Sequence, residues 1–226
     1  MTTTTTLRAI ITGATGMVGE GVLHECLQHP SVESALVIGR KSCGATHPKL
    51  TEILHADFSD ISALTHHLTG YNACFFCSGV SAIGLSEEEY TRITHTLTLN
   101  FARQLSAINP AMTFCYVSGA GTDSTEKGRQ MWARVKGKTE NDLAKLPFKS
   151  VYSFRPGYMH PTPGLKNTIS YYNYVSWLYP AARIFFPGQV STLGELGVAM
   201  INAALYGSEK PVIEVRDIVA LAKKYA

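Results

Sequence analysis

The chain has 226 residues, of which 45% are hydrophobic and 16% charged, and its formal net charge is +3. This length and balance suit one globular α/β domain with a large core, and the small net charge gives no indication of a nucleic-acid partner. No apolar run reaches the length of a membrane span. Five cysteines at irregular spacing and an N-terminus without the pattern of a secretory signal predict reduced thiols and a cytoplasmic protein.

Apolar strands alternate with helical stretches almost to the end of the chain. We expect strands over Leu7–Thr12, Ala35–Gly39, Thr51–His55, Asn72–Ser78, Met112–Ser118, Ser150–Arg155 and Val212–Val215. We expect helices over Val18–Gln28, Ile61–Leu68, Glu87–Ile108, Gly128–Leu146 and Leu193–Tyr206. This alternation is typical of a mostly parallel sheet with helices on both faces. The sequence therefore predicts one doubly wound Rossmann domain over residues 1–226, with residues 1–6 as a flexible tail.

Local signals define both ends of the helix expected over Glu87–Ile108. Ser86 and Glu89 have the spacing of a capping box, in which each residue satisfies a backbone N–H of the other. Asn109 precedes Pro110, and proline disfavours helix at the residue before it. The helix is therefore expected to begin after Ser86 and to end before Asn109.

A glycine-rich turn from Thr12 to Gly19 joins the first strand to the first helix. Gly13 would let the backbone turn, Gly16 would leave space for a pyrophosphate, and Gly19 would allow close packing of the helix. Free N–H groups at the start of that helix favour a diphosphate. In this context the motif predicts a nicotinamide dinucleotide site, and the alternative is a tight turn that binds nothing.

The residues after the second strand indicate which dinucleotide binds. NAD-selective sites usually carry Asp or Glu at this place, about 20 residues past the glycine turn. Here Arg40, followed by Lys41 and Ser42, supplies donors for a 2′-phosphate. We therefore predict NADP(H), against the alternative of a solvated basic loop. Asp57, after the third strand, would lie beside the adenine edge or cap the next helix.

The segment from Pro156 to Pro187 differs in character from the rest of the chain. It holds five prolines and an aromatic cluster of Tyr171, Tyr172, Tyr174, Trp177 and Tyr179. Such aromatics suit a small-molecule pocket, a subunit contact in a homo-oligomer, or ordinary packing on the core. We treat residues 156–190 as a substrate or interface segment.

Cys74 and Cys77 have CxxC spacing, which metal and redox sites also use. The sequence shows no second pair of ligands, and the run around them has the pattern of a buried strand. A free cysteine in such a strand behaves as a small apolar residue. The histidines are scattered, so no metal site is predicted.

Six segments resemble the short-chain dehydrogenase/reductase superfamily, in its atypical and extended, epimerase/dehydratase-like branches. They are Thr12–Gly19, Val37–Lys41, Phe75–Gly79, Tyr116–Gly121, Val135–Lys138 and Phe154–Gly157. The resemblance implies NADP(H) binding and an oxidoreductase or epimerase-like activity on a small carbonyl or hydroxyl substrate. It implies cofactor contacts from Gly13, Thr15, Gly16, Met17, Val18, Gly19, Arg40, Lys41, Asp57, Phe58, Cys77, Ser78, Gly79, Ser118, Lys136, Pro156 and Gly157.

The same resemblance implies a catalytic set of Ser, Tyr and Lys, with Tyr four residues before Lys on one helix. Ser118 and Lys136 match the serine and the lysine, but Trp132 occupies the tyrosine place. An indole N–H is a donor only and does not exchange a proton with a substrate oxygen. This departure puts the standard reductase mechanism in doubt.

Three explanations of Trp132 stay open. In the first, the protein binds NADP(H) without turnover. In the second, another residue such as Tyr90, Tyr158 or His160 supplies the proton. In the third, Trp132 packs in a cleft that has lost its catalytic activity. An enzyme and a dinucleotide-sensing regulatory protein are therefore both compatible with the sequence, because both need the cofactor.

Overall fold

A computed structural model of the protein describes residues 6–167 and 179–225. Residues 1–5 of the expected tail lie outside this part. Four aromatic residues of the Pro156–Pro187 segment, Tyr171, Tyr172, Tyr174 and Trp177, also lie outside the described residues.

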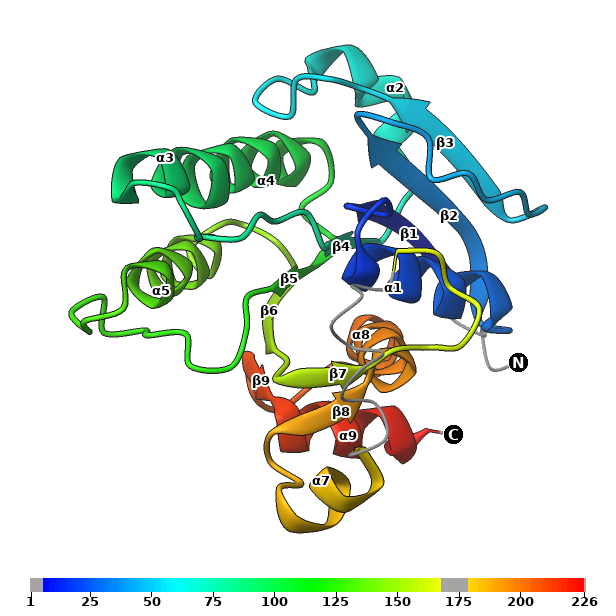
Figure 1. Ribbon diagram of the computed structural model, residues 1–226. Coiled ribbons are helices and arrows are strands. Elements are labelled where there is room, and N and C mark those ends of the chain that lie inside the picture. The colour runs from blue at the N-terminus through cyan, green and yellow to red at the C-terminus, as the bar shows by residue number, and fades with distance from the viewer. Residues whose placement is uncertain (1–5, 168–178, 226) are drawn as a thin grey trace.

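Within the described residues, seven parallel strands form one sheet in the order β3-β2-β1-β4-β5-β6-β9 (Figure 1). Their bounds are β1 Leu7–Thr12, β2 Val32–Gly39, β3 Leu50–Leu54, β4 Ala73–Phe76, β5 Thr113–Val117, β6 Ser150–Arg155 and β9 Val212–Glu214. The chain builds outward from β1 to β3, then returns to β1's other side and builds outward from β4 to β9. This topology confirms the predicted doubly wound fold. Ligands bind in such sheets where the strand order reverses, which here is between β1 and β4.

Helices cover both faces of the sheet (Figure 1). One face carries α1 (Met17–Gln28), α8 (Leu193–Tyr206) and α9 (Val215–Lys224), and the other carries α2 (Thr65–Leu68), α4 (Leu97–Ile108) and α5 (Met131–Leu143). Alternate side chains of β1 serve the two cores: Ile11 packs with α1 and α8, whereas Ile10 packs with α2 and α4. A strand buried on both faces reads as a continuous apolar run, which is why Leu7–Thr12 was recognisable from the sequence.

The helix expected over Glu87–Ile108 is continuous, but it contains a π-helical segment at Arg92–Thr96 between α3 (Glu87–Thr91) and α4. The capping box is confirmed, because Glu89 N donates to Ser86 Oγ and Ser86 N donates to the Glu89 carboxylate. The helix ends at Ile108 with Asn109 as its cap, as predicted. The π-helical register has no counterpart in the apolar pattern, and such segments are frequent at functional sites.

The expected helix over Gly128–Leu146 begins later, at Met131, and ends earlier, at Leu143. The Asp123 carboxylate accepts hydrogen bonds from the backbone N–H groups of Lys127 and Gly128, and from both the N–H and the hydroxyl of Thr125. These bonds hold residues 123–128 in a turn and delay the start of α5. The stretch expected as one helix over Ile61–Leu68 is a 3-10 turn, Ser62–Leu64, followed by α2.

Four elements of the C-terminal third were not predicted from the sequence. They are the short parallel strands β7 (Tyr158–His160) and β8 (Val190–Thr192), which form a separate two-stranded sheet, and the helices α7 (Tyr179–Phe185) and α9. Figure 1 shows β7, β8 and α7 below the large sheet, with β8 beside α8 and α9. β7 and β8 are three residues long and border the proline-rich segment, so no periodic pattern marks them.

Cys74 is fully buried in β4, as predicted, and burial raises the pKa of its thiol well above the ordinary value. All five cysteines are free. Among the described residues, no three His, Cys, Asp or Glu side chains are grouped so as to hold a metal ion. No helix of the described part has both the length and the apolar character needed to cross a bilayer.

Candidate dinucleotide site

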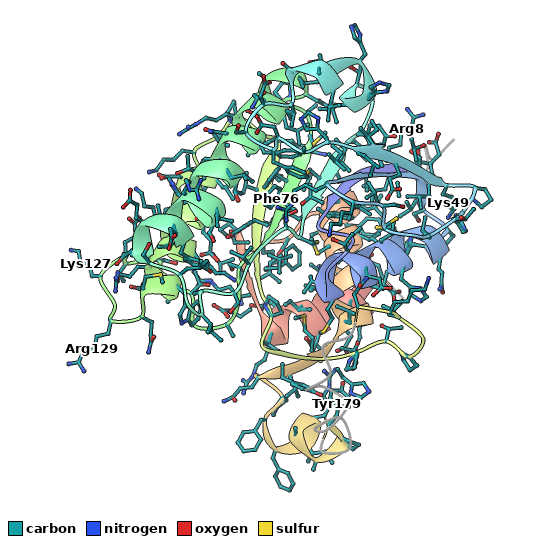
Figure 2. The ribbon with its side chains drawn as sticks, turned by 45° about the horizontal axis from the view of Figure 1, so that its top comes forward. Arg8, Lys49, Phe76, Lys127, Arg129 and Tyr179 are labelled. Atoms are coloured by element: carbon teal, nitrogen blue, oxygen red, sulfur yellow. The ribbon has the colours of Figure 1, made fainter. Side chains whose placement is uncertain are left out.

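A cavity of about 270 Å³ lies at the carboxyl ends of β1 to β4, where the strand order reverses. Its lining comes from the turn after β1, the loops after β2, β3 and β4, and the helix that starts at Glu87. The lining residues are Gly13, Ala14, Thr15, Val37, Gly39, Arg40, Lys41, Ala56, Phe58, Phe76, Ser78, Gly79, Val80, Ile93 and Leu97. Phe76, at the end of β4, lies near the centre of the molecule in Figure 2. One cavity therefore joins the glycine turn to the basic loop.

The glycine turn is built by backbone contacts that leave no space for side chains at two of its positions. Gly13 has a φ of +74°, and a Cβ there would lie 2.7 Å from the carbonyl carbon of Cys77. A Cβ on Gly19 would collide with the Gly13 carbonyl group. The absence of a side chain at Gly19 thus allows α1 to lie close to the backbone of the turn.

Gly16 differs from these two glycines. It is the N-cap of α1 with a φ of −107°, and the nearest atom to a Cβ there would be Gly13 O at 3.5 Å, an ordinary contact. The fold therefore does not require glycine at this position. Glycine here leaves the space in front of the start of α1 open, as a diphosphate at this place would need.

Arg40 and Lys41 line the same cavity and are exposed to solvent. Neither side chain forms a hydrogen bond or an ion pair within the described part of the chain. Glu52, on the neighbouring strand β3, accepts a hydrogen bond of 2.6 Å from Cys43 N instead of pairing with either cation. Both cations are therefore available to an anion in the cavity.

Asp57 does not line the cavity, whereas its neighbour Phe58 does. The Asp57 carboxylate accepts hydrogen bonds from the hydroxyl (2.5 Å) and the backbone N–H (2.9 Å) of Ser59, and these bonds lower its pKa. Asp60, rather than Asp57, accepts from Ser62 N at the start of the following 3-10 turn. Phe58 stacks on Phe101 with ring centroids 5.7 Å apart, which fixes one apolar wall.

A second group of predicted residues meets at the end of β5. Lys136 Nζ, on α5, donates a hydrogen bond to the carbonyl oxygen of Ser118. The Ser118 hydroxyl donates to Glu140 (2.5 Å) and its oxygen lies 3.1 Å from the carbonyl oxygen of Phe154, and the residue is 4% exposed. Burial lowers the pKa of Lys136, and the nearby Glu140 carboxylate partly opposes this effect. The serine hydroxyl is thus engaged by protein groups, and the lysine is half-buried beside it.

Glu140 is part of a buried ion pair that the sequence did not indicate. Arg155, at the end of β6, donates to both oxygens of the Glu140 carboxylate, and the Nε bond measures 3.0 Å. Arg155 also donates to Glu214 Oε1 (3.1 Å) and to the hydroxyl of Ser124 (2.5 Å). One guanidinium therefore joins α5, β6, β9 and the loop after β5. The sequence signal that could have placed Glu140 near the site was its spacing, one helical turn after Lys136.

Trp132 lies one turn before Lys136 on α5 and is half-buried. Its ring packs on the loop after β5, where a Cβ on Gly121 would lie 3.4 Å from the indole. Gly119 and Gly121 both have positive φ angles, +144° and +85°, so this loop presents bare backbone between Trp132 and Lys136. The tyrosine place is therefore filled by a packed indole.

The residues named as substitute proton donors lie in different places. Tyr90, on α3, is 2% exposed, and burial raises the pKa of its phenol. Tyr158 and His160 lie on β7, directly after Gly157, and the His160 ring stacks on Tyr179 at 4.4 Å. The roles of all three remain predictions.

The structure brings two sets of the predicted residues together. Gly13, Thr15, Arg40, Lys41, Phe58, Ser78 and Gly79 line one cavity, and Ser118, Lys136 and Pro156 surround the loop after β5. Gly16, Met17, Val18, Gly19, Asp57, Cys77 and Gly157 lie outside the cavity lining. The sequence did not indicate Ala14, Val37, Ile93 or Leu97, because apolar side chains that line a cavity have the same pattern as those that fill a core.

The sequence profile of the NAD-dependent epimerase/dehydratase family matches residues 9–131, more than half of the chain. The chain belongs to this family. Membership supports a nicotinamide dinucleotide as the cofactor and an oxidoreductase- or epimerase-like protein. The family match covers the glycine turn, the basic loop and the start of α5, so the cavity lies within the shared part.

Three similar proteins illustrate how far the likeness extends. The protein fmp52-1, mitochondrial, of Aspergillus oryzae is 34% identical over 154 residues, which cover 64% of this chain and 63% of the relative. The mitochondrial protein FMP52-1 of Scheffersomyces stipitis is 24% identical over 96% of this chain and 100% of its own length. The solved structure of MoeE5 with UDP-glucuronic acid and NAD has a TM-score of 0.66 at 14% identity, over 97% of this chain and 82% of that one. This last likeness shows the fold.

The alignments with two Aspergillus relatives span 66% and 63% of those proteins, a little under two thirds of their length. These relatives and the Scheffersomyces protein are all named as mitochondrial proteins. The expectation of a cytoplasmic protein is therefore wrong. It rested on the absence of a secretory pattern, which carries no information about organelles other than the secretory pathway.

Proposed function

We propose that the protein binds NADP(H) in the cavity at the ends of β1 to β4 and acts as an oxidoreductase or epimerase-like enzyme on a small carbonyl or hydroxyl substrate. The observation that carries the proposal is the presence of Arg40 and Lys41, without protein partners in the described part, in the same cavity as Gly13 and Thr15. A diphosphate at the start of α1 and a 2′-phosphate at the basic loop would use both ends of this cavity.

Each proposed residue has a distinct role toward the dinucleotide. Gly13 and Gly16 admit the diphosphate, Arg40 and Lys41 bind the 2′-phosphate, and the side chain of Phe58 supports the base. Lys136 would hold the nicotinamide ribose, with the backbone of Pro156 and Gly157 beside it. When bound, the nicotinamide would supply hydride transfer. The protein must supply the orientation of the substrate and a proton.

We propose that residues 156–190 form the substrate side of the same single domain. β7 begins three residues after Arg155, so it leads directly away from the Lys136 end of the site. β7, β8 and α7 stand apart from the large sheet (Figure 1) and would let this segment vary without disturbing the cofactor site.

A regulatory NADP(H)-binding protein is the second candidate. Two observations favour it: Trp132 fills the tyrosine place, and the Ser118 hydroxyl is engaged by Glu140 and Phe154. In this candidate the dinucleotide binds in the same way, and no group exchanges a proton with a substrate.

Calorimetric titration with NADPH, NADH and 2′,5′-ADP tests the shared part of both candidates. We expect NADPH to bind more tightly than NADH, and 2′,5′-ADP to compete with NADPH because it carries the 2′-phosphate without the nicotinamide half of the dinucleotide. Equal affinity for NADPH and NADH would overturn the assignment of NADP(H). Turnover of NADPH with a panel of small aldehydes and ketones then separates the enzyme from the regulatory protein.

A further inference from the structure

Glu140 and Lys136 hold opposite sides of a single residue at the end of β5. The two side chains are one turn apart on α5 and project from the same face of the helix. Lys136 donates to the carbonyl of Ser118, while Glu140 accepts from its hydroxyl. The backbone N–H of Ser118 donates to Phe154 O at 2.9 Å, so every polar group of this residue is bound.

The Glu140 carboxylate has no access to solvent that would compensate its charge. Its side chain is 3% exposed and that of Arg155 is 11% exposed. A buried carboxylate is tolerated only when it is paired and hydrogen-bonded, and here Arg155 and Ser118 supply those partners. The charge of Glu140 is therefore fixed in place beside the lysine.

The charged and titratable groups around Lys136 come from three elements. Glu140 lies on its own helix α5, Arg155 on β6 pairs with the far side of that carboxylate, and the buried phenol of Tyr116 on β5 also interacts with Glu140. Among the described residues, Glu140 is the charged group that acts directly on the Lys136 ammonium. Burial alone would favour the neutral amine, which binds a ribose hydroxyl less strongly than an ammonium does.

We infer that Glu140 is a positioning residue of the dinucleotide site: through Ser118 and Arg155 it aims the Lys136 amine at the nicotinamide end and keeps it protonated. This inference rests on the proposed function for the identity of the ligand. The arrangement of Glu140, Ser118 and Lys136 itself is a property of the free protein, and it can be tested without a ligand.

The first test is an NMR titration of the lysine Nζ signals in the free protein labelled with ¹⁵N-lysine. The Lys136 signal is identified by its loss in Lys136→Met. In Glu140→Gln we expect Lys136 to titrate at a lower pH, by about one pH unit or more, which is the lower end of the roughly 1–3 units that a nearby opposite charge contributes. An unchanged titration midpoint would overturn the inference.

Glu214→Gln is the matched control. It removes a carboxylate from the same Arg155 guanidinium, but Glu214 is half-exposed and has no contact with Ser118 or Lys136 among the bonds described above. The Lys136 midpoint should stay at the wild-type value in this variant. An equal shift in both variants would show that Glu140 acts only through general destabilisation of Arg155, and the inference would fail.

In Glu140→Gln, the Arg155 guanidinium keeps only the half-exposed Glu214 carboxylate as an ion-pair partner, and this variant could fail to fold. The double variant Glu140→Gln with Arg155→Gln removes both buried charges and leaves the net charge unchanged, so it keeps the test valid in that case. The Lys136 midpoint should still fall, by less than in the single variant, because a distant cation is removed with the carboxylate. A midpoint equal to or above the wild-type value would contradict the inference.

NADPH affinity measured from pH 6 to pH 10 separates this inference from the proposed function. If the inference and the proposed function are both correct, NADPH affinity declines as the pH rises. This decline begins at a lower pH in Glu140→Gln than in the wild type or in Glu214→Gln. If the NMR midpoint shifts while NADPH affinity stays independent of pH, Glu140 positions Lys136 but Lys136 does not bind the cofactor. In that case the positioning stands and the assigned role of Lys136 in the proposed function falls.

Discussion

Gly13 and Cys77 lie in direct backbone contact, although they are separated by most of the first half of the chain. A Cβ on Gly13 would stand 2.7 Å from both the carbonyl carbon and the carbonyl oxygen of Cys77. This contact seats the turn after β1 on the end of β4, where the strand order reverses. The fold therefore requires glycine at Gly13 and Gly19, whereas Gly16 has room for a side chain, and Gly13 also lines the cavity.

This division of roles predicts opposite behaviour for two substitutions in one turn. Gly16→Val should fold with near-wild-type stability and lose NADPH binding, because its side chain would occupy the space of the diphosphate. Gly13→Val should lose at least ~2 kcal/mol of stability, because it combines a positive φ with a backbone collision. Urea unfolding and calorimetry measure the two effects. Unchanged NADPH affinity in folded Gly16→Val would show that the loop is only a structural turn.

Arg40→Ala should remove most of the preference for NADPH while leaving NADH affinity unchanged. A charge-assisted contact contributes about 1.5–3 kcal/mol, and about 1.4 kcal/mol corresponds to a tenfold change in affinity, so we expect a loss of tenfold or more. Arg8→Ala is the matched control, since Arg8 (labelled in Figure 2) lies near the start of β1, whereas the cavity lies beyond the end of this strand. Arg8 pairs with Glu33. Calorimetry that finds the same preference in Arg40→Ala as in the wild type would contradict the assignment.

Trp132→Tyr should raise the rate of NADPH-dependent reduction of aldehydes and ketones. A positioned acid contributes about 10²–10⁴-fold, and the new phenol would stand one turn before Lys136. Trp132→Phe is the control, because it removes the indole and adds no hydroxyl. The gain should disappear when Lys136→Ala is added. Rapid, pH-dependent turnover by the wild type would instead indicate another acid, and substitution of Tyr90, Tyr158 and His160 one at a time would locate it.

We expect the Asp142 carboxylate, which lies outside the site, to make a contribution to stability that is lost in acid. The Lys145 ammonium (2.8 Å), with His95 and Lys138, holds the pKa of this carboxyl well below its usual range. A depressed pKa stabilises the fold above the unfolded value of about 3.9 and loses that effect as the pH falls toward the folded value.

Asp142→Asn should therefore cost about 1 kcal/mol at pH 7, and the difference from the wild type should shrink below about pH 4. Urea unfolding at pH 7 and pH 3 measures this change. A difference of the same size at both pH values would show that Asp142 acts through packing rather than through its charge.

The sequence by itself determined the fold class and the position of the glycine turn. Buried parallel strands such as Leu7–Thr12 are continuous apolar runs, and the glycine spacing from Gly13 to Gly19 directly after such a run marks the turn into the first helix. The capping box of Ser86 and Glu89 was also predictable, because it joins residues three apart. The cellular location was predicted wrongly, since no local physical rule encodes it.

Only the tertiary structure decided which distant residues share the site. The sequence cannot show that Ile93 faces the cavity, because a π-helical turn changes the facing of side chains without changing the apolar pattern. It also cannot show that Glu140 pairs with Arg155, since that contact depends on how α5 packs against β6. The physical reason is the same for both: local chemistry selects each element, whereas contacts across the sheet depend on the packing of elements far apart in the chain.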